Sequence, residues 1–376
     1  MRNIGCGIQA LASTLFMNVP AERVREQITS ILGAWGMAED LVRTTAEVMV
    51  ETDLSGVDSH GVSMLMDYET SRQKGKLNLH AQPKIVRETP VTALVDADAG
   101  LGHPAAVMGM ELAIKKAQAM GVGVVSVFNS HHFGAAGYYA ALASRQGLIG
   151  LVTSSTRTLT TVPTRAAVPV LGTNPIAFSA PARRHQPFLL DIATSTVAAN
   201  KVRVFALNGK PLPSGWVVDE RGGSVTDSAR ANDYVFGQKS GGLTPLGGTA
   251  ETSSHKGYGL AMMVQILSST LAGASFSPLR NRTQKPGDPD NAGHFFFALD
   301  PKAFRPDGAF EEDLDAAIDV LRATPPADPA LPVLIPGDPE TVSREKRSRE
   351  GIPVTPALAG KIREICARCG VPFLLE

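Results

Sequence analysis

The stretch Val122-Gly-Val-Val-Ser-Val-Phe-Asn-Ser-His-His-Phe-Gly-Ala-Ala136 contains a β-branched apolar run, two histidines and the start of an alanine-rich segment. Short apolar runs bounded by turn residues are typical of buried strands, whereas alanine-rich stretches favour helices. The same alternation recurs around this stretch. It predicts strands at 91–95, 122–127 and 148–153 and helices at 105–120 and 135–146. An α/β domain is therefore expected over residues 81–307.

A mostly helical part is expected before this domain, over residues 18–80. Apolar residues recur at helical spacing after Pro20, which is tolerated in the first turn of a helix. The pattern predicts helices from Pro20 to Gly33, at 39–54 and at 64–74.

The rest of the chain completes a mixed fold of helices and strands, of the α/β or α+β class. A core helix is expected within 258–276 and a strand at 295–299, with a long polar surface loop at 277–293 between them. Helices expected at 310–322 and 356–369 return to the first part of the chain. Residues 308–376 are therefore assigned to the helical domain.

The composition excludes several classes of function. The 376 residues are 43% hydrophobic and 19% charged, which is typical of a globular protein. Lysine plus arginine equals aspartate plus glutamate at 36 each, so no strong field favours nucleic acid or an anionic membrane. A small-molecule partner is expected.

The three cysteines indicate a reducing compartment, because Cys6, Cys366 and Cys369 are too few for a secreted disulfide framework. A cytoplasmic location is expected. Residues 1–17 form an N-terminal extension without the features of a signal peptide. The Cys366-Ala-Arg-Cys369 pair lacks the partners of a zinc site, so it is expected to pack on a helix, and no metal site is predicted.

The glycine motif of ordinary dinucleotide-binding domains is missing. That motif, GxGxxG, lies between a strand and a helix and lets a pyrophosphate approach the helix. Here Gly121-Val-Gly123 precedes a strand instead. The sequence does not support an ordinary Rossmann domain.

A first polar cluster lies at Asp58-Ser59-His60-Gly61, at an expected helix start. A histidine there can donate a proton to a carbonyl oxygen. The alternative is a helix N-cap by Asp58 or Ser59 with an exposed histidine. A hydrolase with Ser59 as nucleophile is not favoured, since neighbouring side chains usually diverge and no GxSxG elbow is present.

A second cluster, Asn129 to Tyr138, ends an apolar strand and opens a helix. Backbone amides at a helix N-terminus bind phosphates, and His132 can act as an acid or base. The adjacent His131 and His132 also suggest a metal site as an alternative, but no carboxylates occur at the spacing of metal ligands.

Two further clusters follow along the chain. Gly172-Thr-Asn-Pro175 precedes an apolar run that Asp191 closes, and a buried aspartate there either orients a histidine or caps the following turn. Ser254-His-Lys-Gly257 opens an apolar helix, where Lys256 and free amides would bind a phosphate or carboxylate.

The ordered set of these motifs resembles the malate/L-lactate dehydrogenase-like family, which is distinct from the Rossmann-fold lactate and malate dehydrogenases. The likeness runs from about Val24 to the carboxyl end and includes Asp191-Ile-Ala-Thr-Ser195 and Leu334-Ile-Pro-Gly-Asp338. It implies a homodimer with an all-helical part and an unusual α/β domain that binds NAD or NADP. The implied reaction interconverts 2-hydroxy and 2-oxo acids, and reduction of cyclic imines such as piperideine-2-carboxylate is the alternative.

The resemblance also implies roles for individual residues. His60 would be the proton donor with Ser59 and Asp191 as its relay, whereas in some members the histidine that matches His132 is the acid or base. Both histidines remain candidates. The implied cofactor contacts are His132, Phe133, Gly134, Ala135, Ala136, Ser154, Thr156, Thr173, Asn174, Pro175, His255, Lys256, Gly257, Pro336, Gly337 and Asp338.

Substrate preference is expected to depend on Met64. The family commonly has an arginine at this position, placed to meet a second substrate carboxylate, and Met64 removes that partner. Tyr68 matches a family tyrosine and is expected to bond a substrate oxygen. The methionine favours a substrate with an apolar tail and a likeness to the hydroxycarboxylate dehydrogenase branch.

The choice between NAD and NADP is left open by the sequence. Arg344, Lys346, Arg347 and Arg349 are candidates to receive a 2′-phosphate, and a solvated basic helix is the alternative. A nucleotide-binding regulator without catalysis is the competing function from another class.

Overall fold

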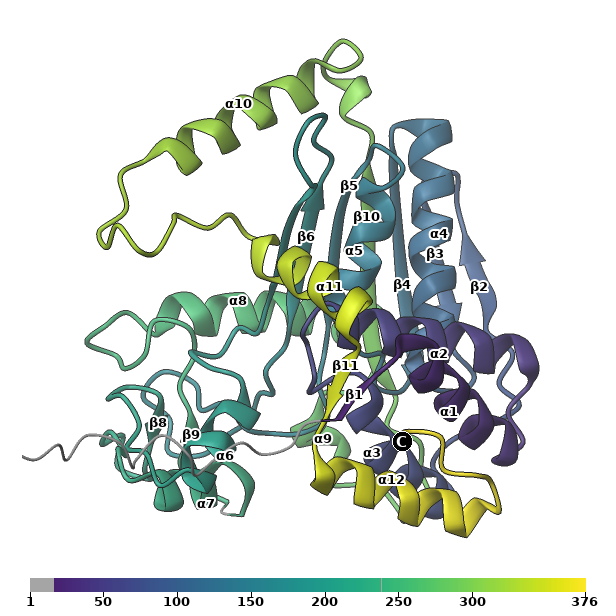
Figure 1. The fold of residues 1–376 in the computed structure, drawn as a ribbon, viewed down its shortest axis with the longest axis vertical. Helices are drawn as coiled ribbons and strands as arrows, with labels where there is room; N and C mark the ends of the chain where they lie inside the picture. Colours follow the sequence, from purple (N-terminus) through teal and green to yellow (C-terminus); the bar gives the residue numbers. More distant parts are fainter. Residues whose placement is uncertain (1–16, 238) are drawn as a thin grey trace, which may run out of the picture. The chain divides into compact units, whose positions relative to one another are not determined.

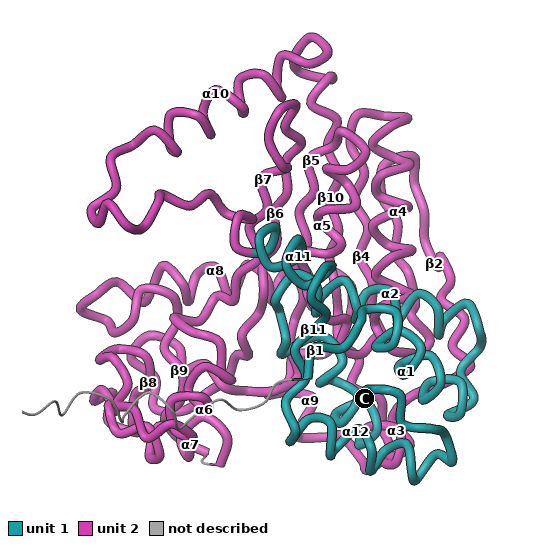
Figure 2. Tube along the Cα trace, in the orientation of Figure 1, with its two compact units in different colours: residues 1–70, 340–376 teal, residues 71–339 magenta. Residues whose placement is uncertain are grey.

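The computed structural model describes residues 17–237 and 239–376. Its chain divides into two compact units, residues 1–70 with 340–376 and residues 71–339 (Figure 2). Cys6 and the expected N-terminal extension up to residue 16 lie outside the described residues. The domain division expected from the sequence remains a prediction, since compactness does not measure independent folding.

The larger unit is built on a mixed sheet, which has seven strands within the described residues. Their order is β2 (Lys84–Glu88), β3 (Thr92–Asp96), β4 (Val122–Ser130), β10 (Ala292–Leu299), β5 (Ile149–Ser154), β6 (Ile176–Ala180) and β7 (Phe188–Ile192). The β3–β4 pair is parallel and the other pairs are antiparallel. Helices α4 (Gly102–Met120) and α5 (Ala136–Ser144) pack side by side on this sheet (Figure 1).

A smaller cluster of elements follows β7 in the same unit. It contains α6 (Ala199–Leu207), β8 (Val217–Val218), α7 (Ser228–Phe236) and β9 (Gly242–Leu243), which enclose their own apolar core. Next come α8 (His255–Gln265), a π-helical turn at Ile266–Thr270, α9 (Ser277–Arg280), a 3-10 turn at Pro301–Ala303 and α10 (Ala309–Ala323). Within the described residues, no helix has both the length and the apolar character needed to cross a bilayer.

The smaller unit is mainly helical. Helix α1 (Ala21–Ala34) buries an apolar stripe and packs on α2 (Glu39–Leu54) and α12 (Pro356–Cys369). A 3-10 turn (Val62–Met64) leads into α3 (Leu65–Gln73), which continues past the boundary of the unit. Strands β1 (Met17–Val19) and β11 (Ile352–Val354) form an antiparallel pair, and α11 (Asp338–Glu350) precedes β11.

Most predicted elements are present, and three predictions need correction. Pro20 is the N-cap of α1 and not part of its first turn. The apolar helix predicted to open at Ser254–Gly257 does begin at His255, but its regular part ends at Gln265, before the π-helical turn and short of residue 276. The long surface loop 277–293 contains α9 and the first residues of β10, because Ala292 and His294 already pair with β4.

Candidate active site

The loop after β4 holds His132 close to the sheet. The Gly102 amide donates to the His132 carbonyl at 3.0 Å, and a Cβ atom on Gly102 would lie 2.4 Å from the His131 carbonyl oxygen. Only glycine permits this approach. The half-buried His132 ring accepts a 3.3 Å hydrogen bond from the Gly134 amide through Nδ1, whereas Phe133 is buried.

The N-terminus of α5 carries a carboxylate. Asp191 Oδ2 accepts from the Gly137 amide at 2.7 Å, and Asp191 lies within β7, opposite Ala177 of β6. Asp191 therefore caps α5. A carboxylate at this helix end disfavours a bound phosphate. The cofactor contacts expected at this end of the helix remain a prediction.

Two candidate cofactor segments meet directly. The Asn174 Oδ1 atom accepts from the Thr156 amide at 3.3 Å and from the Thr156 hydroxyl at 3.2 Å. Asn174 is fully buried, and its amide group donates to the Ala261 carbonyl of α8 at 3.0 Å. Segments 154–156 and 173–175 are thus held together beside α8.

The start of α8 differs from the prediction. The amides of Lys256 and Gly257 donate to the carbonyls of Ser253 and Leu246, so they are not free to bind an anion. The His255 and Lys256 side chains are exposed. Lys256 therefore offers its ammonium group, near the positive end of the helix, as the group suited to a phosphate.

The segment 336–338 lies against β7. The Leu189 amide donates to the Pro336 carbonyl at 3.2 Å. Asp338 accepts from the Ile335 amide at 2.9 Å and from Arg322 at 2.7 Å. This carboxylate fixes the start of α11.

In the smaller unit, Ser59 and His60 contact each other. Ser59 Oγ lies 2.8 Å from His60 Nδ1, so the expectation that these neighbouring side chains diverge is wrong. Burial lowers the pKa of His60 below its ordinary value. The pair is arranged to orient a largely neutral imidazole.

The helix start next to this pair is capped by a different residue. Asp53, at the end of α2, accepts from the Val62 amide at 2.8 Å, whereas Asp58 pairs with Arg347 of α11. The predicted N-cap by Asp58 or Ser59 is therefore wrong. A Cβ atom on Gly61 would lie 1.9 Å from the Asp53 carboxylate, so this approach requires glycine.

The predicted substrate residues follow on the same chain segment. Met64 is half-buried at the end of the 3-10 turn. Tyr68 on α3 is 3% exposed, and burial raises the pKa of its phenol well above the ordinary value. The phenol of Tyr68 is therefore neutral.

Some basic residues of α11 form ion pairs and hydrogen bonds within the smaller unit. Arg344 pairs with Glu51, and Arg347 donates to Asp58 and to the Asp53 carbonyl. Lys346 and Arg349 are the more exposed candidates for a 2′-phosphate, although Lys346 lies 3.9 Å from Glu350 of the same helix.

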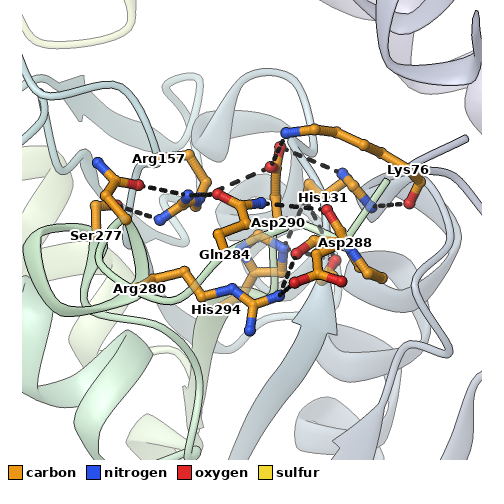
Figure 3. Close-up of polar contacts among 12 residues, drawn as sticks. Lys76, His131, Arg157, Ser277, Arg280, Gln284, Asp288, Asp290 and His294 are labelled. Carbon is orange, nitrogen blue, oxygen red and sulfur yellow. Dashed lines mark hydrogen bonds and ion pairs between the residues drawn. The ribbon is translucent and has the colours of Figure 1, made fainter. Parts of the chain in front are cut away.

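Two residues that the sequence analysis did not single out lie at the ends of β4, β5 and β10 (Figure 3). Asp290 pairs with Lys76 at 3.0 Å and lies 3.5 Å from His131 Nδ1. Burial alone would raise the pKa of Asp290, but hydrogen bonds from His131 and Lys76 lower it. His294 is fully buried beside them, and a lone histidine before the Phe-Phe-Phe run of this strand was the available signal.

The cysteine pair has a packing role in the described residues. Cys366 is buried on α12, and Cys369 accepts from the Trp35 indole at 3.1 Å. In the described ranges, no three His, Cys, Asp or Glu side chains are grouped to hold a metal ion.

Residues 19–363 match the family model described as malate/L-lactate dehydrogenase. This chain belongs to that family. The malate dehydrogenase of Pyrococcus horikoshii is 38% identical over 96% of this chain and 97% of its own. The L-sulfolactate dehydrogenase of Methanocaldococcus jannaschii is 34% identical over 94% and 98%.

Other relatives extend the comparison. The hydroxycarboxylate dehydrogenase B of Escherichia coli K12 is 30% identical over 92% of both chains, which is less than for the malate and sulfolactate dehydrogenases above. The crystal structure of malate dehydrogenase from Entamoeba histolytica matches with a TM-score of 0.89 and 31% identity, over 95% of this chain and 99% of that chain. The expected mixed fold and the dehydrogenase family are confirmed, and the protein is a dehydrogenase of hydroxy acids.

The donor set of the larger unit fits the nicotinamide cofactor that the family implies. The exposed ammonium of Lys256 suits a phosphate, and Thr173 carries a hydroxyl suited to ribose or amide groups. The hydroxyls of Ser154 and Thr156 donate to His294 and Asn174, so they keep only their acceptor capacity for a cofactor. A fixed framework joins them: the Leu246 amide donates to Thr194, whose hydroxyl donates to the Thr173 and Asn174 carbonyls. These segments would hold the cofactor in the absence of a GxGxxG loop.

Proposed function

We propose that the chain interconverts (S)-2-hydroxy acids and 2-oxo acids with NAD or NADP. The observation that carries this proposal is the Ser59–His60 contact, which orients an imidazole with a lowered pKa. When bound, the nicotinamide supplies or accepts the hydride. The chain supplies the proton transfer, its orientation and the binding of both reactants.

In the oxidation direction, neutral His60 Nε2 accepts the hydroxyl proton, while Ser59 holds Nδ1. In the reverse direction, protonated His60 returns this proton to the carbonyl oxygen. Ser59 and Asp191 are proposed as its relay, and His132 is the competing acid or base. Tyr68 is proposed to donate its hydroxyl proton in a hydrogen bond to the substrate.

Met64 supports a substrate with one carboxylate and an apolar tail. A methionine offers no hydrogen bond to a second carboxylate. A substrate with an apolar side chain therefore gives up no hydrogen bond at Met64. Substrates with two acidic groups are the alternative, because relatives of this chain are named malate dehydrogenase and sulfolactate dehydrogenase. A homodimer and a cytoplasmic location are part of the proposal, the latter from the sparse cysteines.

The test measures absorbance of the reduced cofactor with purified protein, NADH or NADPH, and a panel of acids. Pyruvate, phenylpyruvate and oxaloacetate test the side chain, and piperideine-2-carboxylate tests the imine alternative. Turnover of phenylpyruvate or pyruvate above oxaloacetate is expected. Turnover of the imine alone would replace this proposal with an imine reductase.

Two variants assign the proton carrier. Loss of a general acid or base costs about 10²–10⁴-fold in rate. We expect this loss in kcat for His60→Gln and a smaller effect for His132→Gln. His80→Gln, at an exposed histidine, is the matched control. A full loss in His132→Gln with an active His60→Gln would assign the role to His132.

A further inference from the structure

His294 occupies the centre of the larger unit's sheet. Strand β10 lies between β4 and β5, and His294 is opposite Val127 of β4 and Ser154 of β5. It faces the last residue of β5 and a residue near the end of β4, which leads into the loop that carries His132. Its side chain is fully buried.

The ring is bonded on both edges. His294 Nε2 lies 3.2 Å from the His131 carbonyl oxygen and 3.0 Å from Ser130 Oγ, and its Nδ1 lies 2.8 Å from Ser154 Oγ. A carbonyl can only accept, so Nε2 carries the hydrogen and Nδ1 accepts the Ser154 hydroxyl. One neutral tautomer satisfies all of these contacts.

The faces of the ring are also used. His294 stacks on Phe133, with ring centroids 4.4 Å apart and an interplanar angle of 1°. Tyr139 of α5 stacks on the same phenylalanine at 4.9 Å and donates its hydroxyl to the Phe133 carbonyl. The histidine thus contacts both backbone and side chain of the loop after β4.

Electrostatics exclude a proton-carrying role for this ring. Burial lowers the pKa of His294 to about 3, so the ring is neutral throughout the ordinary working range. Protonation would also convert Nδ1 into a donor facing Ser154. The neutral form is therefore the one that keeps the geometry.

We propose that His294 is a positioning residue that joins segments 131–136 and 154–156 into one face for the dinucleotide. The proposal rests on the proposed function, in which both segments contact the cofactor. It assigns to His294 no contact with the reacting atoms. Its loss should weaken cofactor binding more than it slows the chemical step.

The test compares His294→Phe, which keeps a stacking ring and removes all three polar contacts of the ring, with His294→Gln, which keeps a donor and an acceptor. Binding of NADH and NADPH is measured by nicotinamide fluorescence, and kcat at saturating cofactor. Unsatisfied buried groups cost enough to raise Kd about 10-fold in His294→Phe. Partial rescue in His294→Gln and a nearly unchanged kcat are expected.

A second measurement follows the ring in the wild type. Nitrogen-15 NMR should show the fully buried imidazoles, His103 and His294, held neutral from pH 5 to 9. The signal that is absent from His294→Gln should be that of an Nε2–H ring. A ring that titrates or changes tautomer in this range would overturn the proposal, as would wild-type cofactor affinity in a folded His294→Phe. Absence of cofactor binding by the wild type would instead refute the proposed function.

Discussion

At the scale of the residue, the smaller unit places a carboxylate, a serine and a histidine around one short turn. Asp53 caps the turn that starts at Val62, and Ser59 bonds the His60 ring. The Asp53 contact depends on a small neighbour, because only a glycine at position 61 leaves space for its carboxyl group. Burial, and not these contacts, lowers the pKa of His60 and favours its neutral ring.

The lowered pKa of His60 predicts a pH dependence for each direction of the reaction. The neutral ring accepts the proton, so kcat/KM for hydroxy acid oxidation should fall only below about pH 6.5, the ordinary histidine value. Reduction needs the protonated ring and should decline as pH rises through the same pKa. Profiles from pH 4.5 to 8.5 test this, and an oxidation inflection above pH 6.5 would contradict it.

At the scale of the element, side chains from one strand control the ends of others. Asp191 of β7 caps α5, and His294 of β10 bonds the ends of β4 and β5. Asp290 adds ion pairs from the segment before β10. Elements distant in sequence therefore determine the shape of the loops that carry the candidate site.

The cap on α5 can be separated from any catalytic role of Asp191. Asp191→Ala removes the acceptor for the Gly137 amide and should lower the free energy of unfolding by about 1 kcal/mol. Asp191→Asn keeps an acceptor and should retain most of this stability. Urea unfolding and kcat are measured for both. If the Asp191 carboxylate also acts in the proposed proton relay of His60, both variants lose activity. An active Asp191→Asn would show that Asp191 only caps the helix.

At the scale of the whole molecule, the buried carboxyl group of Asp53 makes the free energy of unfolding depend on pH. Burial raises the pKa of Asp53 from 3.8 to about 8, and a hydrogen bond from Val62 opposes this only in part. The folded chain therefore keeps a proton that the unfolded chain releases above pH 4. This group's stabilising contribution is full below about pH 4 and is lost as pH rises towards 8.

Asp53→Asn should abolish this part of the pH dependence. An asparagine side chain can still accept from Val62 but carries no titrating proton. Relative to the variant, the wild type should lose at most about 1.4 kcal/mol of unfolding free energy per pH unit between pH 5 and 7.5. Urea midpoints across this range give the difference, with Asp40→Asn as the exposed carboxylate control on α2. A constant difference across the range would refute the prediction.

Local sequence patterns were sufficient to predict most elements and the family. Helices at 39–54 and 356–369 have the predicted limits, because apolar periodicity, turn residues and Pro356 act locally. The ordered motifs around His60, His132, Asn174 and Lys256 carry the family, since each is a short contiguous stretch.

The contacts between side chains that are distant in sequence could be identified only in the folded chain. Asp191 caps a helix 54 residues away, and His294 bonds Ser154 across 140 residues. Local spacing contains no information on such pairs, because they arise from strand order and register in a mixed sheet. For the same reason the sequence could not predict that the amides of Lys256 and Gly257 form hydrogen bonds within the chain. Sequence patterns describe a segment's own backbone, whereas burial and hydrogen-bond partners depend on what the fold brings to it.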